Sequence, residues 1–198
     1  MTAKKQIGPW TVKSCNAGYE NPWIRLEHNE VVHPDGSDGI YGVVRFKNFA
    51  VGVLPIDEDG HVWLVGQHRF AFDRYSWELP EGGVPRGEDP LAGAKRELRE
   101  ETGLTADHWH AMTRFDISNS VTDEQGQGFI AWGLHRGDCA PDPSEQLALR
   151  RVAFADLLKE VMSGAISDSL TLIMVLMARE LALQGALPEA ISRHIRAA

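Results

Sequence analysis

The chain has 198 residues and a formal net charge of −8 at pH 7. Hydrophobic residues make up 43% of it, enough for a sizeable core in one large domain or in a compact domain with an extension. The acidic balance, without any long basic run, argues against binding to nucleic acid or docking on an anionic membrane.

Two cysteines, Cys15 and Cys139, are too few for a disulfide framework and predict reduced thiols. The first ten residues hold two lysines with no apolar run behind them, which is not typical of a secretory signal. The most apolar stretch, residues 170–183, is interrupted by Arg179 and Glu180 and is too short to span a bilayer. We therefore expect a cytoplasmic protein.

The first part of the chain predicts short strands separated by turns, with candidates at Trp10–Asn16 and Trp23–Val32. No helical period runs through this segment, and it contains little that would bury a core alone. We expect residues 1–46 to form an N-terminal β-extension that covers the substrate or mediates dimerisation. Residues 47–198 are expected to form the main domain.

Two valine-rich runs, Phe49–Ile56 and His61–Gln67, flank a turn-forming Asp-Glu-Asp-Gly sequence and predict strands covered on both faces. Further strands are expected at Arg74–Leu79, Trp109–Ile117, Gly128–Leu134 and Leu149–Phe154. Helices are expected at Pro90–Thr102, Ala155–Met162, from Asp168 or Ser169 to about Gln184, and in the tail from Pro188 to Ile195. This order favours an α/β fold, a mixed sheet with helices on both sides.

The helix predicted at Pro90–Thr102 has clear ends. Asp89 is its expected N-cap, Pro90 suits the first helical position, and Gly103 is the expected C-terminal stop. Within it, Glu97, Glu100 and Glu101 fall on one side, where their repulsion would destabilise an isolated helix.

Glycines surround this acidic face. Gly93 lies one turn before Glu97 and is expected to keep the face open, while Gly82 and Gly83 are expected to take positive φ and admit a close backbone approach. Hard divalent cations favour clusters of carboxylate and carbonyl oxygens, and Mg²⁺ binds through a few carboxylates plus substrate phosphates. From spacing alone, a metal site and a solvated acidic face both stay open.

The stretch GGVPRGEDPLAGAKRELREETGL, residues 82–104, resembles the Nudix box at every fixed position. The matching residues are Gly82, Glu88, Arg96, Glu97, Leu98, Glu100, Glu101, Gly103 and Leu104. The resemblance implies a Nudix-type α/β/α sandwich over roughly residues 45–185 and an enzyme that hydrolyses phosphoanhydride bonds.

The same resemblance implies the roles of the box residues. Glu97, Glu100 and Glu101, with the backbone carbonyl of Glu81, would bind Mg²⁺, for which Mn²⁺ could substitute. Arg96 would orient the carboxylates by charge-assisted hydrogen bonds, so Arg96 and Glu100 count among the catalytic residues. The bound metal would neutralise the substrate's phosphates and lower the pKa of a water molecule that attacks phosphorus.

Two motifs outside the box resemble the ADP-ribose pyrophosphatase and nucleoside-diphosphate-sugar hydrolase branch, namely Gln67-His68-Arg69-Phe70 and Trp77-Glu78-Leu79-Pro80-Glu81-Gly82-Gly83. By that likeness Arg69 would contact a substrate phosphate, and Glu78 would help with the metal or the terminal sugar. A solvated strand end for Arg69 and a surface carboxylate for Glu78 remain alternatives.

The catalytic base of this branch often lies in a loop well after the box, which makes Glu145 the candidate and Asp142 the next. Asp123 and Glu124 are rivals. Two tryptophans of the extension, Trp10 and Trp23, suit a core or a dimer interface. Related enzymes use aromatic residues from this region to stack the base, and Trp23 is our candidate for substrate binding.

Together these observations predict Mg²⁺-dependent hydrolysis of the pyrophosphate bond in a nucleoside diphosphate linked to a sugar, such as ADP-ribose. The products would be a nucleoside monophosphate and a sugar phosphate, and the enzyme would be a homodimer without nucleic-acid or membrane partners. The loop Ser118–Thr122 lacks the Ser-Pro-Gly-like turn of ADP-ribose enzymes. A GDP-hexose, a dinucleoside polyphosphate or an oxidised nucleotide therefore stays open as substrate, as does a non-catalytic nucleotide-sugar sensor.

Overall fold

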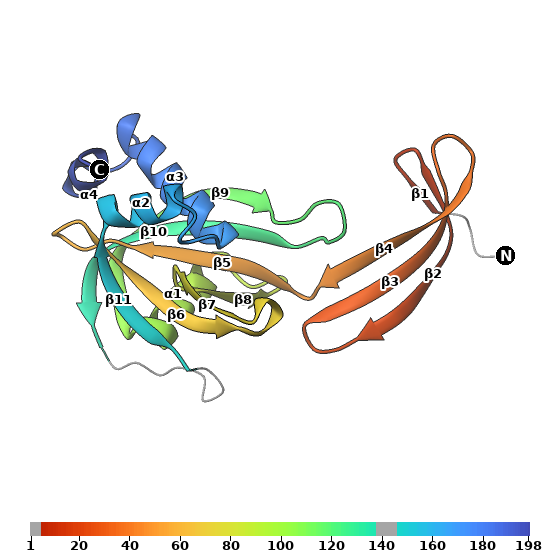
Figure 1. Ribbon diagram of the computed structural model, residues 1–198, viewed down its shortest axis with the longest axis horizontal. Coiled ribbons are helices and arrows are strands. Elements are labelled where there is room, and N and C mark those ends of the chain that lie inside the picture. Colours follow the sequence, from red (N-terminus) through yellow and green to blue (C-terminus); the bar gives the residue numbers. More distant parts are fainter. Residues whose placement is uncertain (1–4, 138–145) are drawn as a thin grey trace. The chain divides into compact units, whose positions relative to one another are not determined.

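The structure, a computed structural model, describes residues 5–137 and 146–198 (Figure 1). The chain divides into two compact units. The first contains the N-terminal residues through Phe49 together with Asp116–Gln125, and the second contains Ala50–Phe115 and Gly126–Ala198.

The first unit is built on an antiparallel sheet in the order β1-β2-β3-β4. Its strands are β1 Lys5–Ile7, β2 Trp10–Glu20, β3 Ile24–Val32 and β4 Asp38–Phe46. The turn before β3 forms because the Asn21 side chain accepts hydrogen bonds from the amides of Trp23 and Ile24, each at 2.8 Å. Both predicted strands are thus present. Strand β2 extends to Glu20, beyond the predicted end at Asn16, whereas β3 begins one residue later than predicted and ends at Val32 as expected.

The second unit contains two sheets, ordered β8-β5-β10-β9 and β11-β6-β7. The strands are β5 Asn48–Pro55, β6 His61–Arg69, β7 Arg74–Glu78, β8 Glu81–Pro85, β9 Leu104–Asp116, β10 Gln125–Arg136 and β11 Ala148–Ala153. The tight turn predicted between β5 and β6 is present, but the strands then diverge into different sheets. They diverge because β5 is already hydrogen-bonded on both edges, to β8 and in parallel to β10.

Four helices and one short 3₁₀ turn, η1 Phe70–Phe72, complete the described part of this unit. The helices are α1 Pro90–Thr102, α2 Phe154–Met162, α3 Ser169–Leu183 and α4 Glu189–Arg196. Figure 1 shows α2, α3 and α4 on one side of β5 and β10, with α1 on the other. The predicted α/β fold class, a mixed sheet with helices plus N-terminal strands, is confirmed.

Helix α3 packs closely on the sheet because glycines face it. A Cβ at Gly52 or Gly128 would lie 2.8 Å from an atom of Met174. Fully buried side chains of β5, β6, β10 and α2, among them Leu54, Leu64, Ile130 and Phe154, form the core. In the described ranges we find no helix with the length and apolar character needed to cross a membrane.

Candidate active site

Helix α1 begins and ends at the predicted residues. The Asp89 side chain accepts a hydrogen bond from the amide of Leu91, and Pro90 occupies the first turn. Gly103 ends the helix in the left-handed region, with φ of 68°. Strand β8, which the sequence analysis did not predict, lies against this helix and brings the start of the box to it.

Gly82 lets the first acidic side chain reach the β8 backbone. A Cβ at Gly82 would lie 2.2 Å from the carboxyl carbon of Glu97 and 2.4 and 2.5 Å from its two oxygens. The predicted close approach is therefore confirmed. The predicted positive φ at Gly82 and Gly83 is wrong, because both lie within an extended strand and neither has a positive φ.

Gly93 serves packing rather than an open face. A Cβ there would lie 2.1 Å from Cγ2 of Val84, a fully buried residue of β8. The expectation that Gly93 keeps the glutamate face open is thus corrected. The missing side chain lets α1 approach β8, which holds the helical carboxylates close to the strand.

Arg96 connects two of the glutamates to the strand. Its Nη1 atom lies 2.8 Å from Oε1 of Glu97 and 2.9 Å from Oε2 of Glu100. Its Nη2 donates to the backbone carbonyl of Gly83 at 3.2 Å. One guanidinium thus restrains two carboxylates at once, as charge-assisted hydrogen bonds can do.

The third glutamate of the face binds the backbone at the start of β8. Oε2 of Glu101, a buried residue, accepts a hydrogen bond from the amide of Glu81 at 3.0 Å. The side chain of Glu81 has one oxygen, Oε2, that is buried and without a hydrogen-bond partner among the described residues. Carboxylate oxygens gathered at one strand end, with a buried oxygen unpaired, are a donor set that fits a hard divalent cation.

Arg69 joins the end of β6 to Glu78 and Glu81. Its Nε lies 3.0 and 2.9 Å from the two carboxylate oxygens of Glu78, its Nη2 also contacts Glu78, and Nη2 donates to Oε1 of Glu81 at 2.7 Å. Glu78 is 3% exposed, so it is not the surface carboxylate of the alternative interpretation. Arg69 is not a solvated strand end either.

This group of charges shifts the pKa values of Glu78 and Glu81 in opposite directions. Burial is the largest single effect and raises the pKa of Glu78, but the hydrogen bond and charge of Arg69 together with hydrogen bonds from Ser76 and Glu81 outweigh it, and the pKa lies below its ordinary value. Burial and the neighbouring carboxylates of Asp168 and Glu78 raise the pKa of Glu81 well above its ordinary range. Strongly shifted carboxyl groups of this kind are common at functional sites.

The geometry agrees with the comparison to known proteins. Residues 47–169, more than half of the chain, match the NUDIX domain. The chain belongs to the Nudix family. Residues 10–44 match a second description, "Nucleoside diphosphate sugar hydrolase N-terminal domain".

Two relatives of this Nudix hydrolase are called ADP-ribose pyrophosphatase. The protein from Mycobacterium tuberculosis is 30% identical over 154 residues, which cover 76% of this chain and 74% of the relative. The protein from Bacillus subtilis is 33% identical over 150 residues, covering 75% and 80%. A crystal structure of an ADP compounds hydrolase superposes with a TM-score of 0.81 at 20% identity, over 92% of this chain and 100% of that one, and supports the fold.

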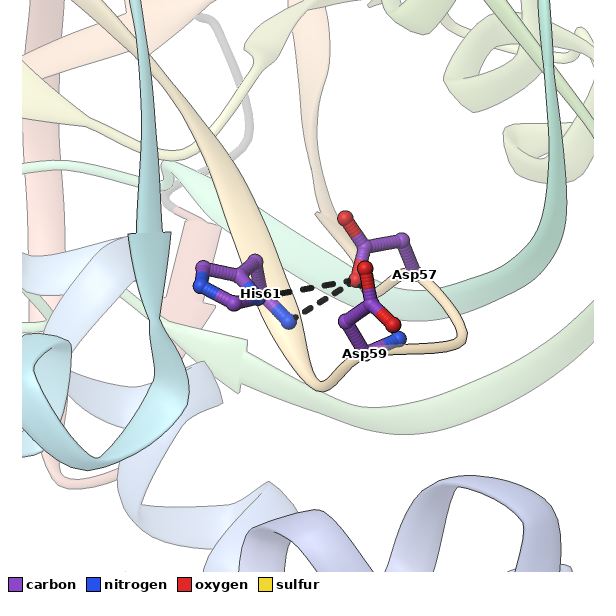
Figure 2. Close-up of side chains that lie close together, drawn as sticks. All are labelled: Asp57, Asp59 and His61. Atoms are coloured by element: carbon purple, nitrogen blue, oxygen red, sulfur yellow. Dashed lines mark hydrogen bonds and ion pairs between the residues drawn. The ribbon is translucent and has the colours of Figure 1, made fainter.

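A second acidic group lies away from the Nudix box, at the turn between β5 and β6. Figure 2 shows Asp57, Asp59 and His61 converging there, close enough for one ligand atom from each to meet at a cation. Arg151 already supplies a positive charge, with Nε 2.6 Å from Asp57 and Nη2 3.0 Å from Asp59. We therefore interpret the two aspartates as ion-pair partners of Arg151 that connect the turn to β11.

The candidates for a catalytic base fall in two places. Glu145 and Asp142 lie outside the described residues. In the first unit, Asp123 accepts a hydrogen bond from the amide of Phe46 at 2.8 Å and lies 3.6 Å from Arg45. Burial raises the pKa of Glu124, which makes its carboxylate a stronger proton acceptor than that of an ordinary glutamate.

The two tryptophans of the first unit have different surroundings. Trp10 lines a cavity of about 300 Å³, where its ring meets that of Tyr41 edge-on at 5.4 Å. Trp23 is 65% exposed in the turn before β3. Substrate binding by Trp23 stays a prediction, and Trp10 is the tryptophan with a concave surface beside it.

A further cavity, of about 280 Å³, opens beside Arg69 and Glu78. Sequence reasoning did not assign Arg74, Ser167 or Asp168 to a site, although all three line it. The only signal was Asp168, expected as a helix cap, and it does accept a hydrogen bond from the amide of Thr171 at 2.8 Å. The contact between Arg74 and Ser167 spans 93 residues of sequence and has no local signature.

Proposed function

We propose that this Nudix hydrolase cleaves the pyrophosphate bond of a nucleoside diphosphate linked to a sugar, with ADP-ribose as the first substrate to test. The reaction would consume water and release a nucleoside monophosphate and a sugar phosphate. The observation that carries the proposal is the convergence of Glu97, Glu100 and Glu101 on the β8 backbone, where Arg96 and the Gly82 position restrain them.

In this proposal Glu97, Glu100, Glu101 and the backbone carbonyl of Glu81 hold Mg²⁺, with Mn²⁺ as a substitute. Bound Mg²⁺ would supply positive charge that neutralises the phosphates and acidifies water. Arg96 would keep Glu97 and Glu100 in place. The names of the relatives and the match of residues 10–44 support a nucleoside-diphosphate sugar as the substrate class.

Arg69 would bind a substrate phosphate through the edge of its guanidinium that faces away from Glu78. Its two carboxylate partners fix the plane of that guanidinium, so little side-chain entropy is lost on binding. Glu145 remains our proposed catalytic base, and Glu145→Gln tests it. A loss of kcat with an unchanged KM would support that role.

The experiment that tests the function is a product assay with and without Mg²⁺. We expect ADP-ribose to yield AMP and ribose 5-phosphate only with Mg²⁺, and faster than GDP-mannose, a dinucleoside polyphosphate or an oxidised nucleoside triphosphate is cleaved. Glu100→Gln and Glu101→Gln should each abolish turnover, whereas Glu58→Gln, at an exposed position in the β5–β6 turn, should not. Tight binding of ADP-ribose without cleavage would refute the enzyme proposal and favour a sensor.

We also propose a homodimer that uses the N-terminal extension, residues 1–46, and a cytoplasmic location. Tyr19, Trp23 and Ile40 expose 57%, 65% and 67% of their surface on the first unit, which supports an interface there. Light scattering at micromolar concentration tests the dimer. A monomeric mass would reject it.

A further inference from the structure

The cavity beside Arg69, here called the Arg74 pocket, is formed by Arg69, Arg74, Ser76, Glu78, Ser167 and Asp168 with their neighbours. These residues come from β6, β7 and the segment before α3. Its volume of about 280 Å³ lies just below the roughly 300–1,000 Å³ typical of small-molecule sites. The space suits one ring rather than a second nucleoside.

The positive charges of the pocket already face negative ones. Arg69 is bound to Glu78 and Glu81, and Asp168 lies near enough to act electrostatically on both Arg69 and Glu81. Two guanidinium groups therefore share the pocket with three carboxyl groups. The pyrophosphate would use the edge of the Arg69 guanidinium that faces away from Glu78. An additional phosphate or carboxylate on the sugar, placed between Asp168 and Glu78, would meet no surplus of positive charge and would be repelled by both carboxylates.

The remaining groups suit hydroxyls. Arg74 donates from Nη2 to Oγ of Ser167 at 2.8 Å, and its guanidinium lies 5.0 Å from the centre of the Phe72 ring. These contacts hold the guanidinium in place with further N–H groups to donate, while the Ser167 hydroxyl keeps its own hydrogen to donate. Carboxylates accept hydrogen bonds, and a sugar hydroxyl both donates and accepts.

We propose that the Arg74 pocket binds the uncharged sugar ring of the substrate and disfavours sugars that carry a negative charge. The inference rests on the proposed function and narrows its substrate class to nucleoside diphosphates of neutral sugars. Arg74 and Ser167 determine affinity for the ring, and Asp168 sets the discrimination by charge.

Two matched substrate pairs test the inference, each with one base and a sugar that differs by an anionic group. The pairs are ADP-ribose with ADP-ribose 1″-phosphate, and UDP-glucose with UDP-glucuronate. We expect kcat/KM to favour the neutral member of the cleaved pair by at least about tenfold. Arg74→Gln and Ser167→Ala should raise KM for the neutral member by about tenfold, the effect of losing one good hydrogen bond.

Asp168→Asn is the decisive variant, because asparagine still caps a helix while the charge is removed. We expect it to lower the preference for the neutral sugar by about tenfold, a change of ratio that a merely structural role would not cause. The control Asp156→Asn removes an exposed carboxylate of α2 outside the pocket and should leave the ratio unchanged.

The outcomes separate the two proposals. Cleavage of no nucleoside-diphosphate sugar would overturn the proposed function and this inference together. Equal cleavage of neutral and charged members, or a ratio that Asp168→Asn does not alter, would overturn only the assignment of the pocket.

Discussion

Gly82→Ala provides a direct test of how the site is held. Alanine adds one carbon, which would lie 2.2 Å from the carboxyl carbon of Glu97. Ordinary contact begins at about 3.4 Å, so the carboxylate must retreat by roughly 1.2 Å, the difference between these distances. A displacement of about 1 Å at a catalytic group costs on the order of a hundredfold in rate.

The same substitution should cost little stability. Gly82 has no positive φ, so alanine fits its backbone, and the obstructing atoms are the far end of a flexible side chain. Moving Glu97 to a less favourable rotamer costs about 0.5–1.5 kcal/mol. We therefore expect kcat for ADP-ribose with saturating Mg²⁺ to fall about a hundredfold, with Tm within about 5 °C of the wild type.

Two other glycines make the comparison sharp. Gly93→Ala meets the stiff, fully buried Val84, so overpacking of about 1–3 kcal/mol exceeds the roughly 0.5–1 kcal/mol that alanine contributes to a helix. Gly42→Ala meets nothing within 4 Å and should change neither property. An unchanged kcat in Gly82→Ala, or a Tm lower than that of Gly93→Ala, would refute this explanation of the site.

Three further predictions concern charges and buried hydrogen bonds. The raised pKa of Glu81 means that the folded protein holds a proton that the unfolded chain releases, so the stability that Glu81 contributes is present at low pH and is lost as pH rises. In metal-free buffer, the amount by which the Tm of Glu81→Gln exceeds that of the wild type should therefore grow between pH 5 and pH 8. A constant difference in Tm would contradict this prediction. Burial is the largest single effect and raises the pKa of Asp57, but the hydrogen bond and charge of Arg151 together with the amides of Asp59 and His61 outweigh it, so the net pKa is lowered. The stability from Asp57 is therefore present above its ordinary pKa and is lost in acid. Asp57→Asn should thus lower the unfolding free energy by about 1–3 kcal/mol at pH 7 and by less at pH 3. It should leave unchanged the Mg²⁺ concentration that gives half-maximal activity. A higher Mg²⁺ requirement would show that the turn binds metal. In the wild type, the buried amide of Leu79 donates to Oγ1 of Thr171 at 2.9 Å. Thr171→Val removes this acceptor and should lower the unfolding free energy, measured in urea, by about 1–3 kcal/mol. An unchanged urea midpoint would show that the hydrogen bond contributes nothing to stability.

Much of the secondary structure could be predicted because its causes are local. Helix α1 begins and ends where its N-cap aspartate, its first-turn proline and its C-terminal glycine place it. Likewise Asp168 caps α3, and the turn at Asn21 forms from its own side chain. Such hydrogen bonds join residues a few positions apart, so the residue types alone carry the information.

The partners of the two central strands could not be predicted in this way. The turn Asp57–Gly60 suggested a simple hairpin, yet β5 pairs with β8 and β10 while β6 pairs with β7 and β11. Valine-rich runs indicate burial on both faces but do not say which neighbour lies beside them. Strand β8 was not predicted because its sequence, Glu-Gly-Gly-Val-Pro, contains four residues of types that are rare in strands. Its strand conformation depends on its neighbours in the sheet.

The sequence by itself determined the Nudix family, the acidic face of α1, and Arg69 and Glu78 as residues of interest. Fixed spacing on one helix and a motif of many positions suffice for that, since both are properties of neighbouring residues. Only the tertiary structure decided that Gly82 accommodates the Glu97 carboxylate, that Gly93 packs on Val84, and that Arg74 meets Ser167. These contacts join residues of different elements, and they depend on how closely α1 packs on β8 and on how the chain brings Ser167 back to Arg74.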